Sequence, residues 1–124
     1  MTSSHRFAFN FVCDERIPET VITYGQEILQ SILLILEFCT DNQVSKLIAI
    51  NAWYTDERAG TIQIRIIDRK LFMNQDELDS AFEIKSNEHP YGNERLYLVK
   101  SMLDIFQSQL MIESGLKTGT IFTF

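Results

Sequence analysis

The run that decides the fold closes the sequence: Ser114-Gly115-Leu116-Lys117-Thr118-Gly119-Thr120-Ile121-Phe122-Thr123-Phe124. Its last five residues are β-branched or aromatic, which is typical of a strand. The apolar residues just before it, at 110–113, predict a second strand. The two glycines between these segments favour a turn. The chain is therefore expected to end in a pair of strands.

Working outward from this pair, hydrophobic periodicity predicts the remaining elements. Residues 7–12 alternate phenylalanine with other side chains, which is the period of a strand. Two more strands are expected at 47–54 and 61–68, joined by a hairpin at 56–60. Helices are expected from about Val21 or Tyr24 to Phe38, over 74–82 with Asn74 as the cap, and from Asn93 onward through Phe106. This order predicts an α+β fold: a two-layer α/β sandwich with a mixed sheet of about five strands and three helices on one face.

The first predicted helix is unusually apolar. One side carries Ile28, Ile32, Ile35 and Phe38, with Leu29, Leu33 and Leu36 beside it. Because this stripe is wider than a surface helix needs, the helix is expected to be the central element of the core. The whole chain, 1–124, is expected to form one domain, and to be a fragment of a larger signalling protein.

Composition excludes several classes of function. The 124 residues carry a net charge of −6, from 17 acids and 11 bases, and nucleic-acid binding requires a clustered basic face. The two cysteines, Cys13 and Cys39, are expected to be small buried hydrophobes, so no metal site is predicted. No segment reaches the roughly 20 apolar residues that cross a bilayer. A cytoplasmic domain is expected, which can still be part of a protein anchored in the inner membrane.

The predicted order resembles the ATP-binding domain of sensor histidine kinases, in the wider family of gyrase and Hsp90. Residues 28–33 are similar to the entry to that family's first helix, and residues 61–68 to the strand that ends in its adenine-binding aspartate. The closing run matches the family pattern Ser-x-x-Gly-x-Gly-Thr-x-Phe-x-Phe, with Lys117 in place of the first glycine. The resemblance implies a histidine-kinase ATPase-like fold.

Positions that the resemblance would assign to chemistry have changed. The family carries two asparagines on the first helix, one for a water and one for Mg²⁺, and these positions fall on Leu34 and Phe38. Neither side chain has the oxygen that Mg²⁺ requires. No catalytic residue, cofactor or metal is therefore expected.

The glycine-rich phosphate loops of the family are also missing. The first, Asp-x-Gly-x-Gly, reads Asp68-Arg69-Lys70-Leu71-Phe72, so Lys70 and Phe72 replace the glycines. Phe72 is expected to occupy space that a nucleotide needs. A lone acid such as Asp68 is more often a surface carboxylate paired with a neighbouring base. In the second loop, aligned with residues 91–96, no glycine is in register.

The resemblance implies a catalytically inactive module of a phosphorelay, of the kind seen in phosphorelay intermediates of the Rcs type. Such a module docks a response regulator, a histidine phosphotransfer domain, or both. The candidate contacts with a partner are the polar residues around the vacated cleft: Arg69, Lys70, Asn74, Glu94 and Arg95. Two alternatives stay open. One is an active ATP-binding kinase domain, supported by the retained Asp68, Gly119 and Thr120. The other is a small-molecule sensor whose pocket is lined by Phe38, Phe72 and Tyr91.

Overall fold

The computed structural model describes residues 7–17, 25–41, 46–56, 61–105 and 107–124. Five strands and three helices occur in these ranges, in the order β1 (Phe7–Cys13), α1 (Gly25–Thr40), β2 (Lys46–Asp56), β3 (Thr61–Asp68), α2 (Gln75–Asp79), α3 (Glu94–Ile105), β4 (Met111–Gly115) and β5 (Gly119–Thr123). The expected start of the first helix at 21–24, most of the expected hairpin at 56–60, and Phe106 lie outside the described residues.

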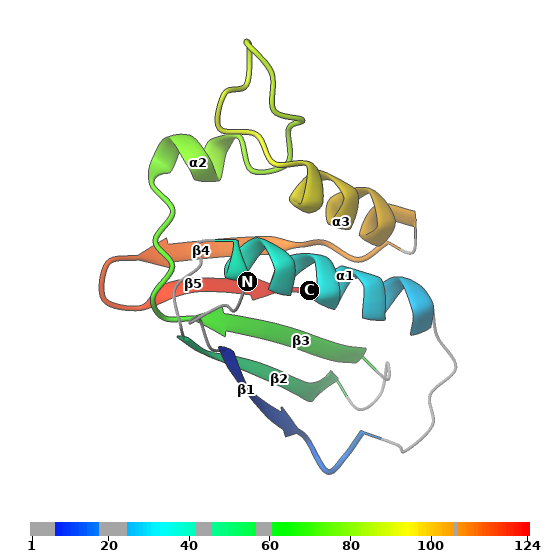
Figure 1. Ribbon diagram of the computed structural model, residues 1–124. Helices are drawn as coiled ribbons and strands as arrows, with labels where there is room; N and C mark the ends of the chain where they lie inside the picture. The colour runs from blue at the N-terminus through cyan, green and yellow to red at the C-terminus, as the bar shows by residue number, and fades with distance from the viewer. Residues whose placement is uncertain (1–6, 18–24, 42–45, 57–60, 106) are drawn as a thin grey trace, which may run out of the picture.

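The strands form one mixed sheet in the order β1-β2-β3-β5-β4. β1 pairs with β2 in parallel, and all other neighbouring pairs are antiparallel. The helices lie on one side of this sheet, with α1 and α3 next to each other (Figure 1). The α+β sandwich predicted from the order of the elements is confirmed.

The core lies between the helices and the centre of the sheet. The strand register places Ile50, Ile66 and Phe122 in one row across β2, β3 and β5. All three side chains are buried and face the helices, which contribute the buried residues Ile35, Cys39, Leu96, Val99 and Leu103. Phe38 of α1 meets Phe122 edge to face, with ring centroids 6.0 Å apart. Burial of this apolar area is the main force that holds the helices on the sheet.

Helix α1 contributes a buried face to the core. Its fully buried residues are Ser31, Ile35 and Cys39, spaced one turn apart. Other apolar residues of the helix are partly buried against the same core: Ile32, Leu34, Leu36 and Phe38. Leu29 and Leu33 are half exposed, because the two-layer architecture covers only the face that meets the sheet and α3.

Both later helices begin as their sequences predicted. Asn74 caps α2, accepting a hydrogen bond from the Glu77 N–H at 2.9 Å, while the Glu77 carboxylate accepts one from the Asn74 N–H at 3.1 Å. Asn93 caps α3 by accepting from the Leu96 N–H at 3.1 Å. These side chains satisfy backbone donors that have no partner within a helix.

The two cysteines lie in different environments. Cys39 is buried in the core as expected, but Cys13 is exposed because it lies at the end of the edge strand β1; neither forms a disulfide. No cluster of three or more acidic, histidine or cysteine side chains suited to a metal ion occurs among the described residues. In the same ranges, every helix is too short or too polar to cross a bilayer.

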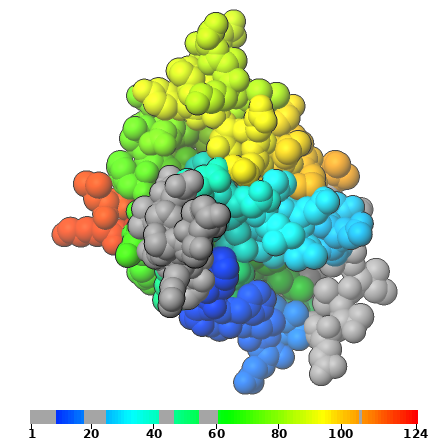
Figure 2. All heavy atoms as spheres, in the orientation of Figure 1, coloured from blue at the N-terminus to red at the C-terminus, as the bar shows by residue number. Residues whose placement is uncertain are grey.

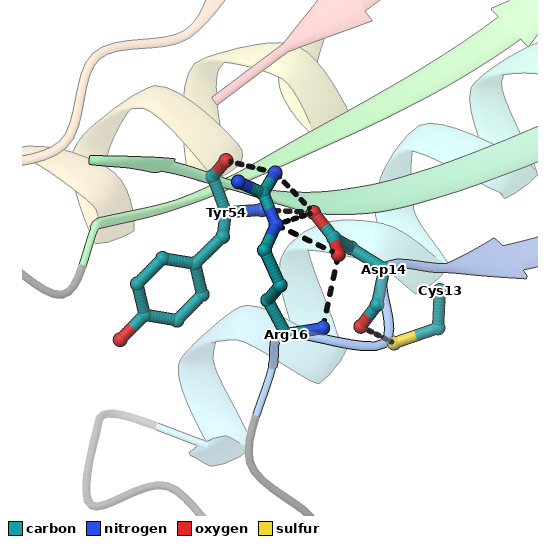
Figure 3. Close-up of polar contacts among 4 residues, drawn as sticks. All are labelled: Cys13, Asp14, Arg16 and Tyr54. Atoms are coloured by element: carbon teal, nitrogen blue, oxygen red, sulfur yellow. Dashed lines mark hydrogen bonds and ion pairs between the residues drawn. The ribbon is translucent and has the colours of Figure 1, made fainter. Parts of the chain in front are cut away.

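The end of β1 is tied to β2 by an ionic cluster (Figure 3). The Asp14 carboxylate accepts hydrogen bonds from the Arg16 side chain at 2.7 Å, from the Arg16 N–H at 3.0 Å and from the Tyr54 N–H at 3.0 Å. The Arg16 guanidinium also donates to the Tyr54 carbonyl at 3.0 Å. These hydrogen bonds, foremost those from the Arg16 side chain, hold the pKa of Asp14 well below its usual value.

This cluster predicts an acid-sensitive contribution to stability. Because the folded protein lowers the pKa of Asp14, the ionised carboxylate stabilises the fold above the unfolded pKa of about 3.9, and this contribution is lost as the pH falls through the folded value. Asp14→Asn is expected to lower the free energy of unfolding at pH 7, and its difference from the unmodified protein should shrink below about pH 4. Urea unfolding at a series of pH values measures this. Glu15→Gln, at the exposed neighbouring position, is the control. A difference between D14N and the unmodified protein that does not vary with pH would contradict the assignment.

Candidate functional site

A row of polar side chains crosses the sheet beside the apolar core. The register pairs Asp68 at the end of β3 with Thr120 on β5, and Thr120 with Ser114 on β4. Because alternate residues of a strand share a face, all three point to the same side as Ile66 and Phe122, towards the helices. This polar row is the candidate site. The sequence singled out Asp68 and Thr120, whereas Ser114 was noted only as part of the closing run.

Asp68 is fully buried. Its Oδ1 accepts hydrogen bonds from the backbone N–H groups of Lys70 at 3.1 Å and Leu71 at 3.2 Å. The expectation of a surface carboxylate is therefore wrong. Since a buried carboxylate is costly unless it is hydrogen-bonded, the chain after β3 turns back so that its N–H groups reach this side chain.

Thr120 and Ser114 hold the next part of the same segment. The fully buried Thr120 hydroxyl donates to the Leu71 carbonyl at 2.8 Å and lies 2.8 Å from the Ser114 hydroxyl. The Ser114 oxygen accepts from the Met73 N–H at 2.9 Å. Since the single Thr120 proton is directed at Leu71, the proton between the two hydroxyls comes from Ser114. The polar row thus binds the backbone of residues 69–73, which we call the β3–α2 linker.

The side chains of the β3–α2 linker alternate between the core and solvent. Leu71 and Met73 are buried, whereas Phe72 between them is about half exposed. The side chains of Leu71 and Met73 enter the core, and the occupation of nucleotide space by Phe72 stays a prediction.

Gly119 packs directly against the start of the linker. Its φ is +74°, and a Cβ atom placed on it would lie 2.3 Å from both the Arg69 Cα and the Asp68 carbonyl oxygen. Only glycine combines this backbone conformation with such a close approach. The β4–β5 turn and the end of β3 therefore meet backbone to backbone, which sets Thr120 within reach of Leu71.

Two residues of α1, Leu34 and Phe38, align through the resemblance with the asparagines of kinases. Both side chains are apolar and lie in apolar surroundings. Phe38 packs against Phe122 at the edge of the core. Leu34 contacts the core on one side and lines a groove between α1 and α3 on the other. Neither position offers an oxygen to a metal ion.

The N-terminus of α3 is closed by the chain itself. Asn93 occupies the cap, and Glu94 is an acidic residue in the first turn. A Cβ atom on Gly92 would lie 2.4 Å from the Glu83 carbonyl oxygen, so the preceding loop is packed against its own backbone. This end of the helix is arranged for self-capping, in contrast to open phosphate-binding helix ends.

This architecture is similar to that of solved histidine kinase domains. The catalytic domain of histidine kinase ThkA, in a nucleotide-free form, superposes with a TM-score of 0.72 and 12% identity, covering 95% of this chain and 76% of that chain. The mycobacterial sensor histidine kinase MprB gives a TM-score of 0.72 at 16% identity, covering 94% of this chain and 78% of that chain. The chain has the fold of a histidine-kinase ATPase domain. No family model and no curated protein matches the sequence.

Larger proteins with this histidine-kinase ATPase fold extend beyond the present chain. The blue-light activated histidine kinase EL346 of Erythrobacter litoralis gives a TM-score of 0.60 at 16% identity, and the match covers 34% of its length. A bacterial phosphotransferase gives 0.63 at 9% identity, with 55% of its length covered. The identities are low, so these comparisons concern the fold alone.

The five candidate partner-binding residues lie on three parts of the fold: the turn after β3, the cap of α2 and the first turn of α3. Arg69 and Lys70 are exposed in the turn after β3, and the Asn74 side chain is used by the α2 cap. Arg95 forms ion pairs with Asp41 and, at 3.6 Å, with Glu37 of α1. Together with Glu94, it lines a groove completed by Lys85, Gly92, Asn93 and Leu98.

The packing of Gly119 predicts a large effect of a single methyl group. Gly119→Ala should destabilise the domain by more than about 2 kcal/mol, because alanine disfavours positive φ and its Cβ would overlap the Asp68–Arg69 backbone. Gly25→Ala, where an added Cβ meets nothing within 4 Å, is the matched control and should be neutral or slightly stabilising. Urea unfolding compares the two. Equal stability of both variants would mean that the turn does not pack as described.

Removal of the Thr120 hydroxyl is expected to cause a smaller loss of stability than the Gly119 substitution. Thr120→Val keeps the shape of the side chain and removes the donor to Leu71, so it should cost about 1–3 kcal/mol. Thr118→Val, at an exposed position of the same turn, should change stability by less than about 0.5 kcal/mol. Thermal or urea unfolding measures both. If T120V were as stable as T118V, the hydroxyl would not hold the linker.

Proposed function

We propose that this chain is a catalytically inactive, ATPase-like module of a two-component phosphorelay protein, which docks a response regulator or a neighbouring histidine phosphotransfer domain. The observation that carries the proposal is the use of the polar row. Asp68, Thr120 and Ser114 bind the protein's own β3–α2 linker. Through the resemblance, Asp68 corresponds to the adenine-binding aspartate of kinases.

The residues retained from the kinase pattern all have a structural role in this chain. Asp68 caps the turn after β3, Thr120 holds Leu71, and Gly119 allows the two segments to meet. Their presence is thus explained without a nucleotide. These roles support the inactive module over the alternative of an active kinase domain.

Magnesium and phosphate also lack their usual partners. Phosphoryl transfer depends on positioning and on neutralising charge with a metal ion. Phe38 and Leu34 supply no oxygen for Mg²⁺, and Glu94 repels phosphate at the start of α3. Each missing hydrogen bond to a charged group costs roughly 1.5–3 kcal/mol, against about −8 kcal/mol for a micromolar ligand. Affinity for Mg-ATP is therefore expected to be millimolar at best.

The proposed docking role is supported by the fold, which indicates the class of signalling protein and not the individual partner. Histidine-kinase ATPase domains belong to two-component signalling proteins, so the partners expected for an inactive member are receiver and phosphotransfer domains. The sensor alternative would require a pocket lined by Phe38, Phe72 and Tyr91; the two grooves described near α3 are lined by other residues.

Thermal unfolding with and without about 0.2 mM Mg-ATP, which is about 100 times the dissociation constant of a 2 μM site but well below a millimolar one, tests the inactive assignment. A true site at 100 times its dissociation constant would stabilise the domain by about 2.7 kcal/mol, or roughly 10 °C for a domain of this size. We expect a shift of less than about 1 °C. The ThkA catalytic domain, measured in parallel, serves as the positive control. A shift of several degrees that requires both Mg²⁺ and ATP would contradict the proposal.

A further inference from the structure

The outer surface of the helical layer exposes large apolar side chains along both long helices. On α1 these are Leu29 and Leu33, one turn apart, with Leu33 50% exposed. On α3 they are Leu98, 48% exposed, and Ile105, 73% exposed. The surfaces of α1 and α3 adjoin on the face seen in Figure 2. A row of this kind is larger than scattered surface leucines and is typical of a contact surface.

A groove runs between the two helices at this place. It is lined by Gln30, Leu33, Leu34 and Glu37 of α1 and by Leu98 and Met102 of α3, and its volume is about 440 Å³. Arg95 in the first turn of α3 forms ion pairs with Glu37 and Asp41 at the end of α1. The start of one helix thus lies beside the end of the other, so the two helices run antiparallel. Four of the six lining side chains are apolar, so the floor of the groove is hydrophobic along both helices.

The charge at one end of the groove indicates the chemistry of its occupant. Glu37 lines the groove with a side chain that is 57% exposed, and its contact with Arg95 is 3.6 Å long. Arg95 makes its closer ion pair with Asp41. The adjoining groove, which shares Leu98, holds Glu94 together with Lys85 and Arg95 and so adds no net negative charge. Glu37 and Asp41 against Arg95 still leave one negative charge at this end, in a protein of net charge −6, and this favours a basic partner.

We propose that the α1–α3 groove binds an amphipathic α-helix of the signalling partner, with its apolar stripe on Leu33, Leu98 and Met102 and a lysine or arginine beside Glu37. This rests on the proposed docking function and assigns its surface. The groove has the features of helix recognition: an apolar floor at helical spacing, bounded by a polar amide at Gln30 and an acid at Glu37. An apolar centre with a charged rim is also the usual anatomy of a protein interface.

Two synthetic 18-residue peptides test the chemistry of the occupant. Both carry leucines at positions i, i+3, i+4 and i+7 and form helices; one carries lysines on the flanks and the other carries glutamates. Titration of the whole chain by fluorescence anisotropy is expected to give binding of the lysine peptide that is at least about tenfold tighter, and that weakens with salt. Equal binding of both peptides would overturn the role assigned to Glu37.

Matched substitutions test the place of binding. Leu33→Asp and Leu98→Asp should each weaken the lysine peptide by about tenfold or more, because they put a charge on the apolar floor. Leu116→Asp, in the 84% exposed turn between β4 and β5, should have no effect, and Leu47→Asp tests the opposite face of the sheet. Both groove residues are half exposed, so the variants are expected to fold. Chemical-shift mapping on the unmodified protein gives a second readout that needs no variant.

The outcomes separate this inference from the proposed function. Chemical shifts confined to α1 and α3, with loss of binding in L33D and L98D, support the groove. Binding that is lost only in L47D, or shifts that map elsewhere, would overturn it. A receiver domain that binds the unmodified protein and both groove variants equally, but not Arg69→Ala/Lys70→Ala, would overturn the groove and leave the docking function standing. Binding of Mg-ATP would instead count against the proposed function.

Discussion

The arrangement of this protein depends on one buried carboxylate. Asp68 lies at the end of the central strand β3, with the apolar core beside it, and no solvent reaches it. A carboxylate in such a place must find donors, and the N–H groups of Lys70 and Leu71 supply two of its hydrogen bonds. Turning the backbone to supply them directs the β3–α2 linker over the sheet, where Thr120 and Ser114 bind it in turn.

The same row of side chains combines a sequence pattern that resembles that of kinases with hydrogen bonds inside the protein. Asp68, Gly119 and Thr120 match the kinase pattern in sequence, and the fold matches histidine-kinase ATPase domains at 12–16% identity. The side chains of Asp68 and Thr120 form hydrogen bonds with residues 70 and 71 of the same chain. Replacement of the loop glycines by Lys70 and Phe72 goes together with this tight turn. The identity of a residue thus carries less information about function than the atoms it contacts.

Local patterns in the sequence were sufficient for the elements and their caps. The alternation of 61–68 and the capping signature at Asn74 depend only on neighbours in the chain, and both predictions are confirmed. The burial of Asp68 could not be predicted in this way, because it results from the pairing of β3 with β5, about 50 residues further on. Apolar residues occur on several sides of α1. The periodicity of its sequence therefore could not show that Leu33 faces a groove while Ile35 is buried in the core.

Native-state amide hydrogen exchange of the β3–α2 linker tests the central claim most directly. If the polar row holds the linker, the amides of Leu71 and Met73 should exchange with a free energy of opening close to that of global unfolding, and Mg-ATP should leave their rates unchanged. Rapid exchange of these amides would contradict the account, because the linker would then be open. So would exchange rates that change when Mg-ATP is added, since the polar row would then serve a nucleotide.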